Sequence, residues 1–136
     1  MQFTSTLITI TSAVLAGLST AAPANSAGDF VPGRCGIHVT QWQKNENGVG
    51  ADYQFDVVVN DGVGNGVGGV SRLAVPDFET RSFTSGLNGD ISITAGAVDA
   101  DSVKFVYEGF TFSSANGCAT GGYEDGNREM DCGFAC

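Results

Sequence analysis

The amino-acid sequence predicts an all-β domain: an antiparallel β-sandwich or a partly closed β-barrel, stapled by disulfide bonds. Val, Thr and Phe dominate after residue 22, where Leu occurs only at Leu73 and Leu87, and this composition suits pleated strands. Short runs of alternating apolar and polar residues recur between Gly- and Asn-rich breaks, which is typical of antiparallel sandwiches and barrels. No helical periodicity extends over eleven residues in this part of the chain.

The first 21 residues predict a secretory signal peptide. A run of apolar and small residues from 7 to 18 precedes the small residues Ala21 and Ala22, and no charged side chain occurs before Asp29. An apolar segment of about 7–15 residues before a small-residue cleavage site is typical of such peptides, whereas a membrane span needs roughly 20 residues. We therefore expect the protein to be secreted and extracellular.

One domain is expected behind the signal peptide. Residues 22–34 are small and irregular, with Pro23, Pro32 and Gly33, and predict a flexible lead-in. Residues 35–136 are long enough for a single β domain. No later segment is apolar enough to span a bilayer, so we expect no membrane insertion, and we expect a monomer.

The first two strands are predicted to form a hairpin. Side chains alternate between apolar and polar over residues 36–43 and again over 53–59, with a turn at 44–50 between them. This period of two predicts one buried and one outer face. The apolar face carries Ile37, Val39, Tyr53, Phe55, Val57 and Val59, and the opposite face carries His38, Thr40, Trp42, Gln54, Asp56 and Asn60.

Further strands are predicted at residues 70–75, 78–84, 90–95 and 103–112, followed by one or two short strands after Cys118. Asn88-Gly89 predicts a two-residue type I′ hairpin turn, because both of its positions need a positive φ. Gly109 lies where the alternation of the strongest strand changes phase, which predicts a β-bulge.

The four cysteines predict two disulfide bonds, as is usual for an even count in a small secreted chain. Three pairings are possible, and the sequence does not choose among them. We favour a bond from Cys35 to the C-terminal region, because it closes a loop worth about 4–5 kcal/mol, with a second bond within 118–136. Zinc is the alternative, but the spacing of Cys35, Cys118, Cys132 and Cys136 does not suit it, and we expect no metal.

A glycine-rich segment contains the pattern of dinucleotide-binding loops at Gly64, Gly66 and Gly69. Such a loop needs a following helix to receive the pyrophosphate, and Pro76 leaves no room for one. A calcium loop around Asp61 and Asn65 would need a bidentate Glu and flanking helices, which are missing. We therefore expect no cofactor, and we interpret the glycines as sharp turns or a mobile loop that could serve partner recognition.

Charge and motif content argue against nucleic acid and against catalysis. The net charge of −9 repels phosphate backbones and anionic lipids. His38 is the only imidazole, and the sequence holds no G-x-S-x-G motif. The carboxylate pair Asp52/Asp56 brackets a strand, and Asp99/Asp101 suits a turn, so we expect no catalytic residues and no enzyme.

Binding is the function class that remains. Trp and Tyr are frequent interface anchors, which draws attention to Trp42, Tyr53, Tyr107 and Tyr123, although ordinary core or rim packing is the more common reason for such residues. Trp42 stands out because its face also carries His38 and Thr40 rather than an apolar stripe. The candidate partner-contact residues are Trp42, His38, Asp61, Asn65 and Tyr123.

The chain is acidic and contains few cysteines, like the small secreted proteins of filamentous fungi. Within it, CGIHVTQW at 35–42 and YQFDV at 53–57 resemble the Alt a 1-like group of secreted fungal allergens and elicitors. The resemblance implies a β-sandwich or barrel and an effector or elicitor role towards a plant host. The partner would be a host extracellular protein or a cell-wall glycan. Two alternatives stay open: an inhibitor or toxin-like protein that inserts the loop 61–69, and a glycan-binding or cell-wall-associated protein that uses Trp42.

Overall fold

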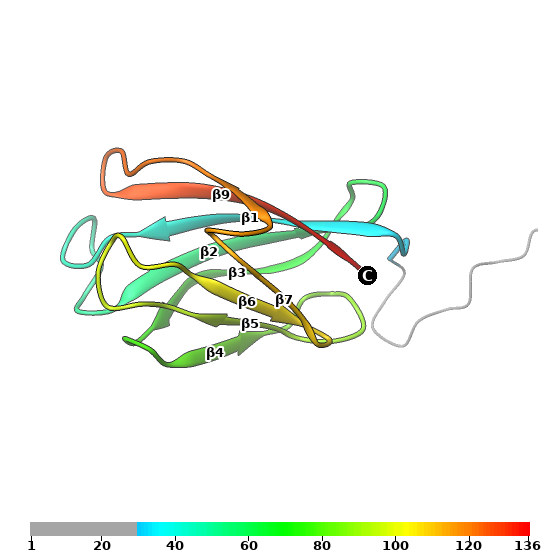
Figure 1. The fold of residues 1–136 in the computed structure, drawn as a ribbon, viewed down its shortest axis with the longest axis horizontal. Helices are drawn as coiled ribbons and strands as arrows, with labels where there is room; N and C mark the ends of the chain where they lie inside the picture. The colour runs from blue at the N-terminus through cyan, green and yellow to red at the C-terminus, as the bar shows by residue number, and fades with distance from the viewer. Residues whose placement is uncertain (1–29) are drawn as a thin grey trace, which may run out of the picture.

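A computed structural model describes residues 30–136 of the chain. Over this part the chain forms nine strands and no helix, and the strands make two antiparallel sheets that lie face to face (Figure 1). The predicted all-β class is confirmed, and the architecture is a sandwich whose sheets do not close into a barrel. The expected signal peptide, 1–21, and residues 22–29 of the expected lead-in lie outside the described residues.

The larger sheet is built around the first strand of the chain. The predicted hairpin of the first two strands is confirmed, and β1 also pairs with the last strand, so that His38 lies between Val58 and Asp131. In order across the sheet, the strands are β3 (Gly66–Val75), β2 (Tyr53–Asn60), β1 (Arg34–Trp42), β9 (Asn127–Ala135) and β8 (Cys118–Thr120).

The smaller sheet is a simple meander in which each strand pairs with the next one along the chain. Its strands are β4 (Thr80–Phe83), β5 (Ile91–Thr94), β6 (Lys104–Tyr107) and β7 (Phe110–Ser113), in that order.

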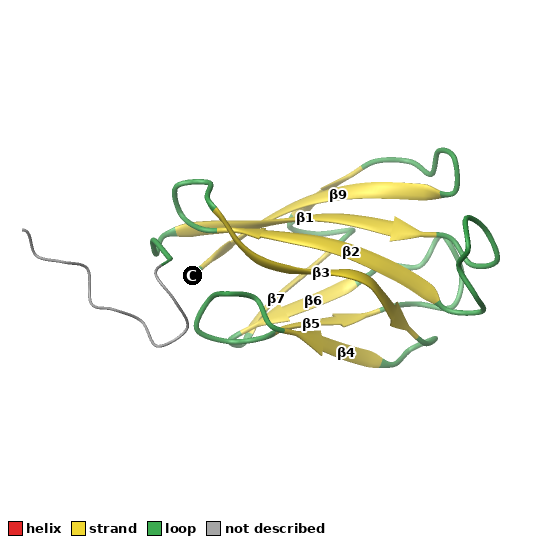
Figure 2. Cartoon of the chain, turned by 180° about the vertical axis from the view of Figure 1, so that it is seen from behind, coloured by secondary structure: helices red, strands yellow, loops and turns green. Residues whose placement is uncertain are grey.

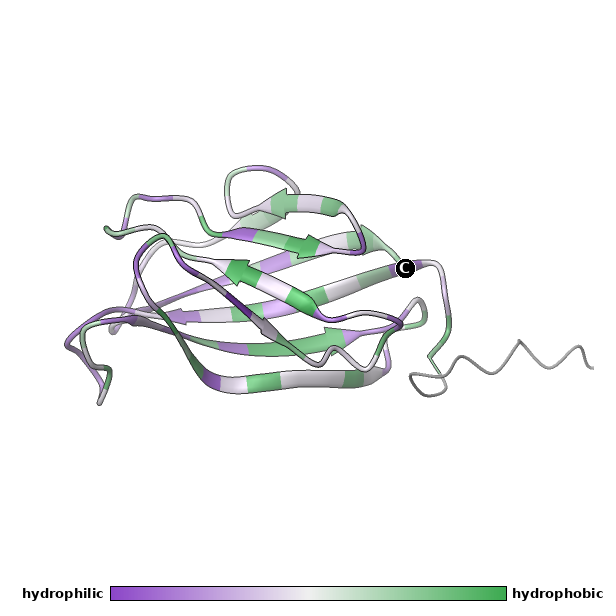
Figure 3. Cartoon of the chain, turned by 90° about the horizontal axis from the view of Figure 1, so that it is seen from below, coloured by the Kyte–Doolittle hydropathy of each residue, from purple (hydrophilic) through white to green (hydrophobic). Residues whose placement is uncertain are grey.

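The core lies between the sheets and follows the predicted period of two, which Figure 3 shows as apolar and polar bands along the strands. Phe55 and Phe105, from opposite sheets, are both fully buried. Phe112 stacks on Phe105 at 5.4 Å between ring centroids and on Phe134 at 5.2 Å. The predicted buried face of the first hairpin is confirmed at Ile37, Val39, Tyr53, Phe55, Val57 and Val59.

Two turn predictions for the smaller sheet are wrong. Asn88-Gly89 is not a type I′ turn, because β4 and β5 are joined by seven residues, 84–90, which bury Leu87 in the core. The two-residue turn is instead at Glu108-Gly109, whose φ angles are 43° and 83°, so Gly109 does not form the predicted bulge. The predicted strand 103–112 is therefore two strands, and Tyr107 pairs directly with Phe110.

The glycine-rich segment allows close packing of backbone on backbone. The strand predicted at 70–75 begins earlier, at Gly66, so these glycines lie in a turn and a strand. A Cβ atom on Gly68 would collide with the carbonyl oxygen of Ser85, and one on Gly86 would collide with that of Val67. The glycines thus let the backbone of β3 lie directly against the backbone of the loop 84–90.

The disulfides join Cys35 to Cys136 and Cys118 to Cys132, which confirms the pairing that we favoured. The first connects the two ends of the described chain. Residues 30–33 of the expected flexible lead-in are held against the domain, because Phe30 is buried and Gly33 exchanges two backbone hydrogen bonds with Cys136.

Candidate functional site

The five candidate contact residues do not form one surface. Asp61 and Asn65 lie at the end of the sandwich that holds the Cys35–Cys136 bond. His38 lies midway along the outer face of the larger sheet, and Trp42 lies on the same face towards the other end. Tyr123 belongs to the loop before β9 at that other end.

Asp61 holds backbone together and is not available to a partner. Its carboxylate is buried and accepts the backbone N–H groups of Val31 (3.0 Å), Val63 (3.1 Å) and Asn65 (2.9 Å). These bonds, that from Val31 foremost, lower the pKa of Asp61 below its usual range. The turn 61–65 is therefore a fixed element rather than a mobile loop.

The imidazole of His38 on β1 lies beside two carboxylates of the neighbouring strand β9. Its Nδ1 lies 2.7 Å from Oδ1 of Asp131, and its Nε2 lies 3.7 Å from Oε1 of Glu129. The hydrogen bond to Asp131 is the main cause that raises the pKa of His38 above 6.5, while partial burial opposes it. Among the described residues, no group of three His, Cys, Asp or Glu side chains could hold a metal ion.

Trp42 is already occupied by its neighbours on the sheet. Its Nε1–H donates to Oδ2 of Asp56 at 2.7 Å, and the guanidinium of Arg72 lies 3.7 Å over its ring. Asp56 also accepts from the backbone N–H of Arg72 and the hydroxyl of Ser71. Burial raises the pKa of Asp56, but these three hydrogen bonds outweigh it and lower the pKa below its usual range.

The three tyrosines contribute more to the interior than to the surface. Tyr53 and Tyr107 are each 1% exposed, so ordinary packing explains them. Tyr123 is half-buried beneath the guanidinium of Arg128, which lies 4.8 Å from its ring centroid. Burial is the main cause that raises the pKa of Tyr123 to about 12.

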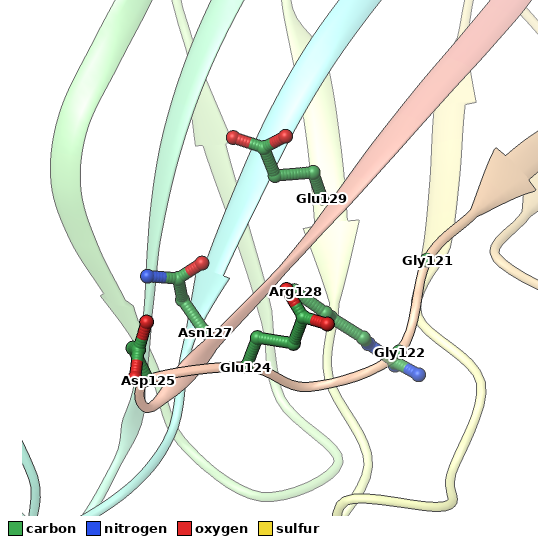
Figure 4. A pocket seen from close by; sticks show the side chains of 7 residues that line it. All are labelled: Gly121, Gly122, Glu124, Asp125, Asn127, Arg128 and Glu129. Carbon is green, nitrogen blue, oxygen red and sulfur yellow. The ribbon is translucent and has the colours of Figure 1, made fainter.

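A different surface shows the features of a contact site, and we call it the loop end. It consists of the four loops 43–52, 76–79, 95–103 and 121–126, which gather at the end of the sandwich away from the C-terminus (Figures 1 and 2). It contains two open hollows of about 310 and 460 Å³. Figure 4 shows the larger one, lined by Gly121, Gly122, Glu124, Asp125, Asn127, Arg128 and Glu129.

The loop end rests on a polar network between the two sheets. Arg128 points away from Glu129 (Figure 4), and it donates to Oε1 of the buried Gln41 at 2.8 Å and to the carbonyl of Asp101 at 3.2 Å. Asp99 accepts from the hydroxyl of Tyr53 at 2.7 Å. These bonds fix the loop 95–103 against the larger sheet.

The turn role expected for the pair Asp99/Asp101 is confirmed at Asp101. Its Oδ2 accepts the backbone N–H groups of Ala97 and Val98, at 2.8 and 3.1 Å. Hydrogen bonds from these two groups, that from Val98 foremost, lower the pKa of Asp101. The tip of this loop is thus held in one conformation, with the Val98 side chain 58% exposed.

Phe78 is the most exposed large apolar side chain of the described residues, at 73%. Its backbone lies in the left-handed region, with φ 59°, which is costly for a bulky residue. The bond from its N–H to the carbonyl of Ala95 (3.0 Å) ties it to the loop of Val98, and Lys44 joins the same two loops through Asp77 and the carbonyl of Ala97.

Sequence reasoning missed Phe78, which it placed in the strand predicted at 78–84. The strand begins at Thr80 instead. The available signal was a single aromatic between Asp77 and Glu79, two residues after Pro76, which suits a turn better than a strand.

The fold and this surface define a class: a disulfide-bonded antiparallel β-sandwich with a rigid acidic loop surface and an exposed aromatic ring at one end. Comparison with family models, with curated proteins and with solved structures gives no match for this chain. Over residues 30–136, no helix is long and apolar enough to cross a membrane.

Proposed function

We propose that the protein is a secreted fungal effector or elicitor, which acts by binding an extracellular target of a plant host. The signal-peptide pattern of residues 1–21 and the two disulfides support secretion, because such bonds persist in oxidising compartments. The resemblance of segments 35–42 and 53–57 to the Alt a 1-like group supports the host interaction.

The observation that carries the binding role is Phe78. In the free protein its ring gains little from burial, and its left-handed backbone costs about 1–2 kcal/mol. Strain of this kind persists where the surrounding structure enforces it, and it gathers at sites of recognition and catalysis. A partner that covers the ring would gain the burial of a large aromatic side chain, which dominates many interfaces.

The rigidity of the loop end supports the same role. Arg128, Asp99 and Asp101 fix the loop that neighbours Phe78 before any partner arrives. Binding therefore loses little conformational entropy at this surface, and pre-organisation of this kind raises affinity.

The test is infiltration of purified residues 22–136, with disulfides intact, into leaves of several plant species. We expect cell death, or a changed defence output, which Phe78→Asn produces only at higher concentration and reduced, unfolded protein does not produce. Absence of any response to the native protein, both alone and together with a known defence trigger, would overturn the effector role.

A second candidate, a secreted inhibitor, is favoured by the turn 61–65. Val63 is 64% exposed at its tip, and Asp61 fixes the backbone beneath it, as an inserted loop requires. The protrusion is shorter than the loop 61–69 expected from the sequence, because Gly66 already belongs to β3. Inhibition of a panel of secreted plant proteases that is lost in Val63→Asp would support this candidate. The glycan alternative gains no such support, since Arg72 lies over the ring of Trp42.

A further inference from the structure

We infer that the partner of the loop end is a basic protein surface with an apolar pocket, into which Phe78 inserts beside Val98. This inference rests on the proposed function and adds the chemistry of the target. Two sets of observations carry it: the placement of the apolar side chains and the distribution of charge around them.

The apolar part is small and protrudes. Phe78 is 73% exposed and Val98 is 58% exposed, and their loops are joined by the bond between Phe78 N–H and Ala95 O. A ring that projects from a rigid surface fits a concave partner better than a flat one. The hollow beside Val98, of about 310 Å³, is open to solvent and lined largely by polar groups, so it does not enclose a small apolar ligand.

The charged part is negative on balance. The loops of the loop end hold one basic residue, Lys44, whose side chain is 19% exposed and whose Nζ is bound to Asp77 and to Ala97 O. The nearby Arg128 also points inward, to Gln41. Against these stand eight carboxylates: Glu46, Asp52, Asp77, Glu79, Asp99, Asp101, Glu124 and Asp125. Two of them have cationic partners, since Asp77 pairs with Lys44 and Glu79 lies 2.8 Å from Arg81 of β4.

The negative charge of the loop end determines which kind of partner it attracts. Complementary potentials steer association and suppress wrong partners, so the loop end favours a surface rich in Lys and Arg. It disfavours phosphate backbones and acidic proteins. Neutral wall polysaccharides offer neither the charge nor a pocket for the ring.

The experiment uses leaf apoplastic fluid, separated by ion exchange into basic and acidic proteins, with protease-treated fluid as the polysaccharide probe. Each fraction is immobilised, and binding of labelled residues 22–136 is measured at 50 and 300 mM NaCl. Three variants accompany the native protein: Phe78→Asn, the loop-end triple Glu46→Gln/Glu124→Gln/Asp125→Asn, and the control pair Asp90→Asn/Glu108→Gln from the opposite end.

We expect saturable binding of the native protein to the basic fraction. Its affinity should fall at least fivefold at the higher salt concentration, and also in Phe78→Asn and in the loop-end triple. In the control pair the affinity should fall less than twofold. Binding to the acidic or the polysaccharide fraction alone, or to no fraction, would overturn the inference. Equal losses of affinity in the loop-end triple and the control pair, or full binding by Phe78→Asn, would also overturn it. Non-specific electrostatic attraction would then be enough to explain the binding. Any of these results together with an intact leaf response would leave the effector role standing.

Discussion

His38 on β1 and Asp131 on β9 form a hydrogen-bonded pair that depends on the pairing of the first and last strands. Alternation placed His38 on the outer face of β1, but its partner Asp131 comes from β9, 93 residues further along. Only the pairing of the first and last strands brings the two together, and no local pattern announces such a register.

The pKa of His38 provides a prediction about this pair. It should titrate above 6.5 in an NMR pH series, which is simple because the chain has a single histidine. Asp131→Asn should return the pKa towards 6.5, and Glu129→Gln should change it less, because its contact is longer. The protonated form is favoured in the folded state, so the contribution to stability is full below about pH 6.5 and is lost as pH rises through the folded pKa.

A titration of the native His38 at or below 6.5, or one unaffected by Asp131→Asn, would contradict this account. Because the imidazole is partly exposed, solvent screening keeps the associated stability change small.

Trp42 and Phe78 show why contact residues were harder to predict than the core. Trp42 lies on the outer face as expected, yet Arg72, from the second strand across, covers its ring. Phe is a residue type that is common in strands, but Phe78 lies in the turn before β4. In both cases exposure depends on which segments meet in three dimensions, and this information is not local in sequence.

Among the strands, faces were predictable and turns were not. A period of two fixes the inward side of β1 and β2 from composition alone. The predicted turn at 88–89 is wrong because Leu87 is buried in the core and belongs to the longer loop 84–90. The turn at 108–109 was missed because Glu rarely occupies a position with positive φ.

The turn between β6 and β7 allows a stabilising substitution. Glu108→Asn should raise the free energy of unfolding by about 0.5–1 kcal/mol, because Asn adopts a positive φ more readily than Glu. Urea denaturation followed by tryptophan fluorescence or circular dichroism measures it. Asn88→Ala serves as the control and should change stability by less than about 0.5 kcal/mol. A larger loss of stability in this variant would indicate that residues 88–89 do form a type I′ turn.

The contact between β3 and the loop 84–90 makes a second prediction about the strands. Gly68→Ala should destabilise the protein by about 1–3 kcal/mol, because the added methyl group meets the backbone of Ser85. Gly66→Ala is the matched control, since its Cβ would have ordinary space and an ordinary φ. Equal stability of the two variants would show that the close approach is absent in solution.

For the molecule as a whole, the two disulfides should contribute unequally. The Cys35–Cys136 bond spans 101 residues and the Cys118–Cys132 bond spans 14. In the chain-entropy account they contribute about 4–5 and about 3 kcal/mol to stability. Paired Cys→Ala variants compared by urea denaturation should keep this order, and the reverse order would show that local effects outweigh loop closure.

The overall architecture was predictable because composition, alternation and cysteine count all agree on one class of fold. The loop end was not, since its four loops are distant in sequence and meet only after the sandwich has formed. Its acidic character is visible in the sequence as a net charge of −9, but the concentration of eight carboxylates at one end is a property of the fold.

Phe78→Asn tests the central claim most directly when its stability and its potency in leaves are measured on the same preparation. We predict a free energy of unfolding that is unchanged or higher by up to about 1 kcal/mol, since Asn tolerates φ near 60°. The concentration for a half-maximal leaf response should rise at least tenfold. A clear loss of stability, or a potency equal to that of the native protein, would show that the exposed ring is not held there for a partner.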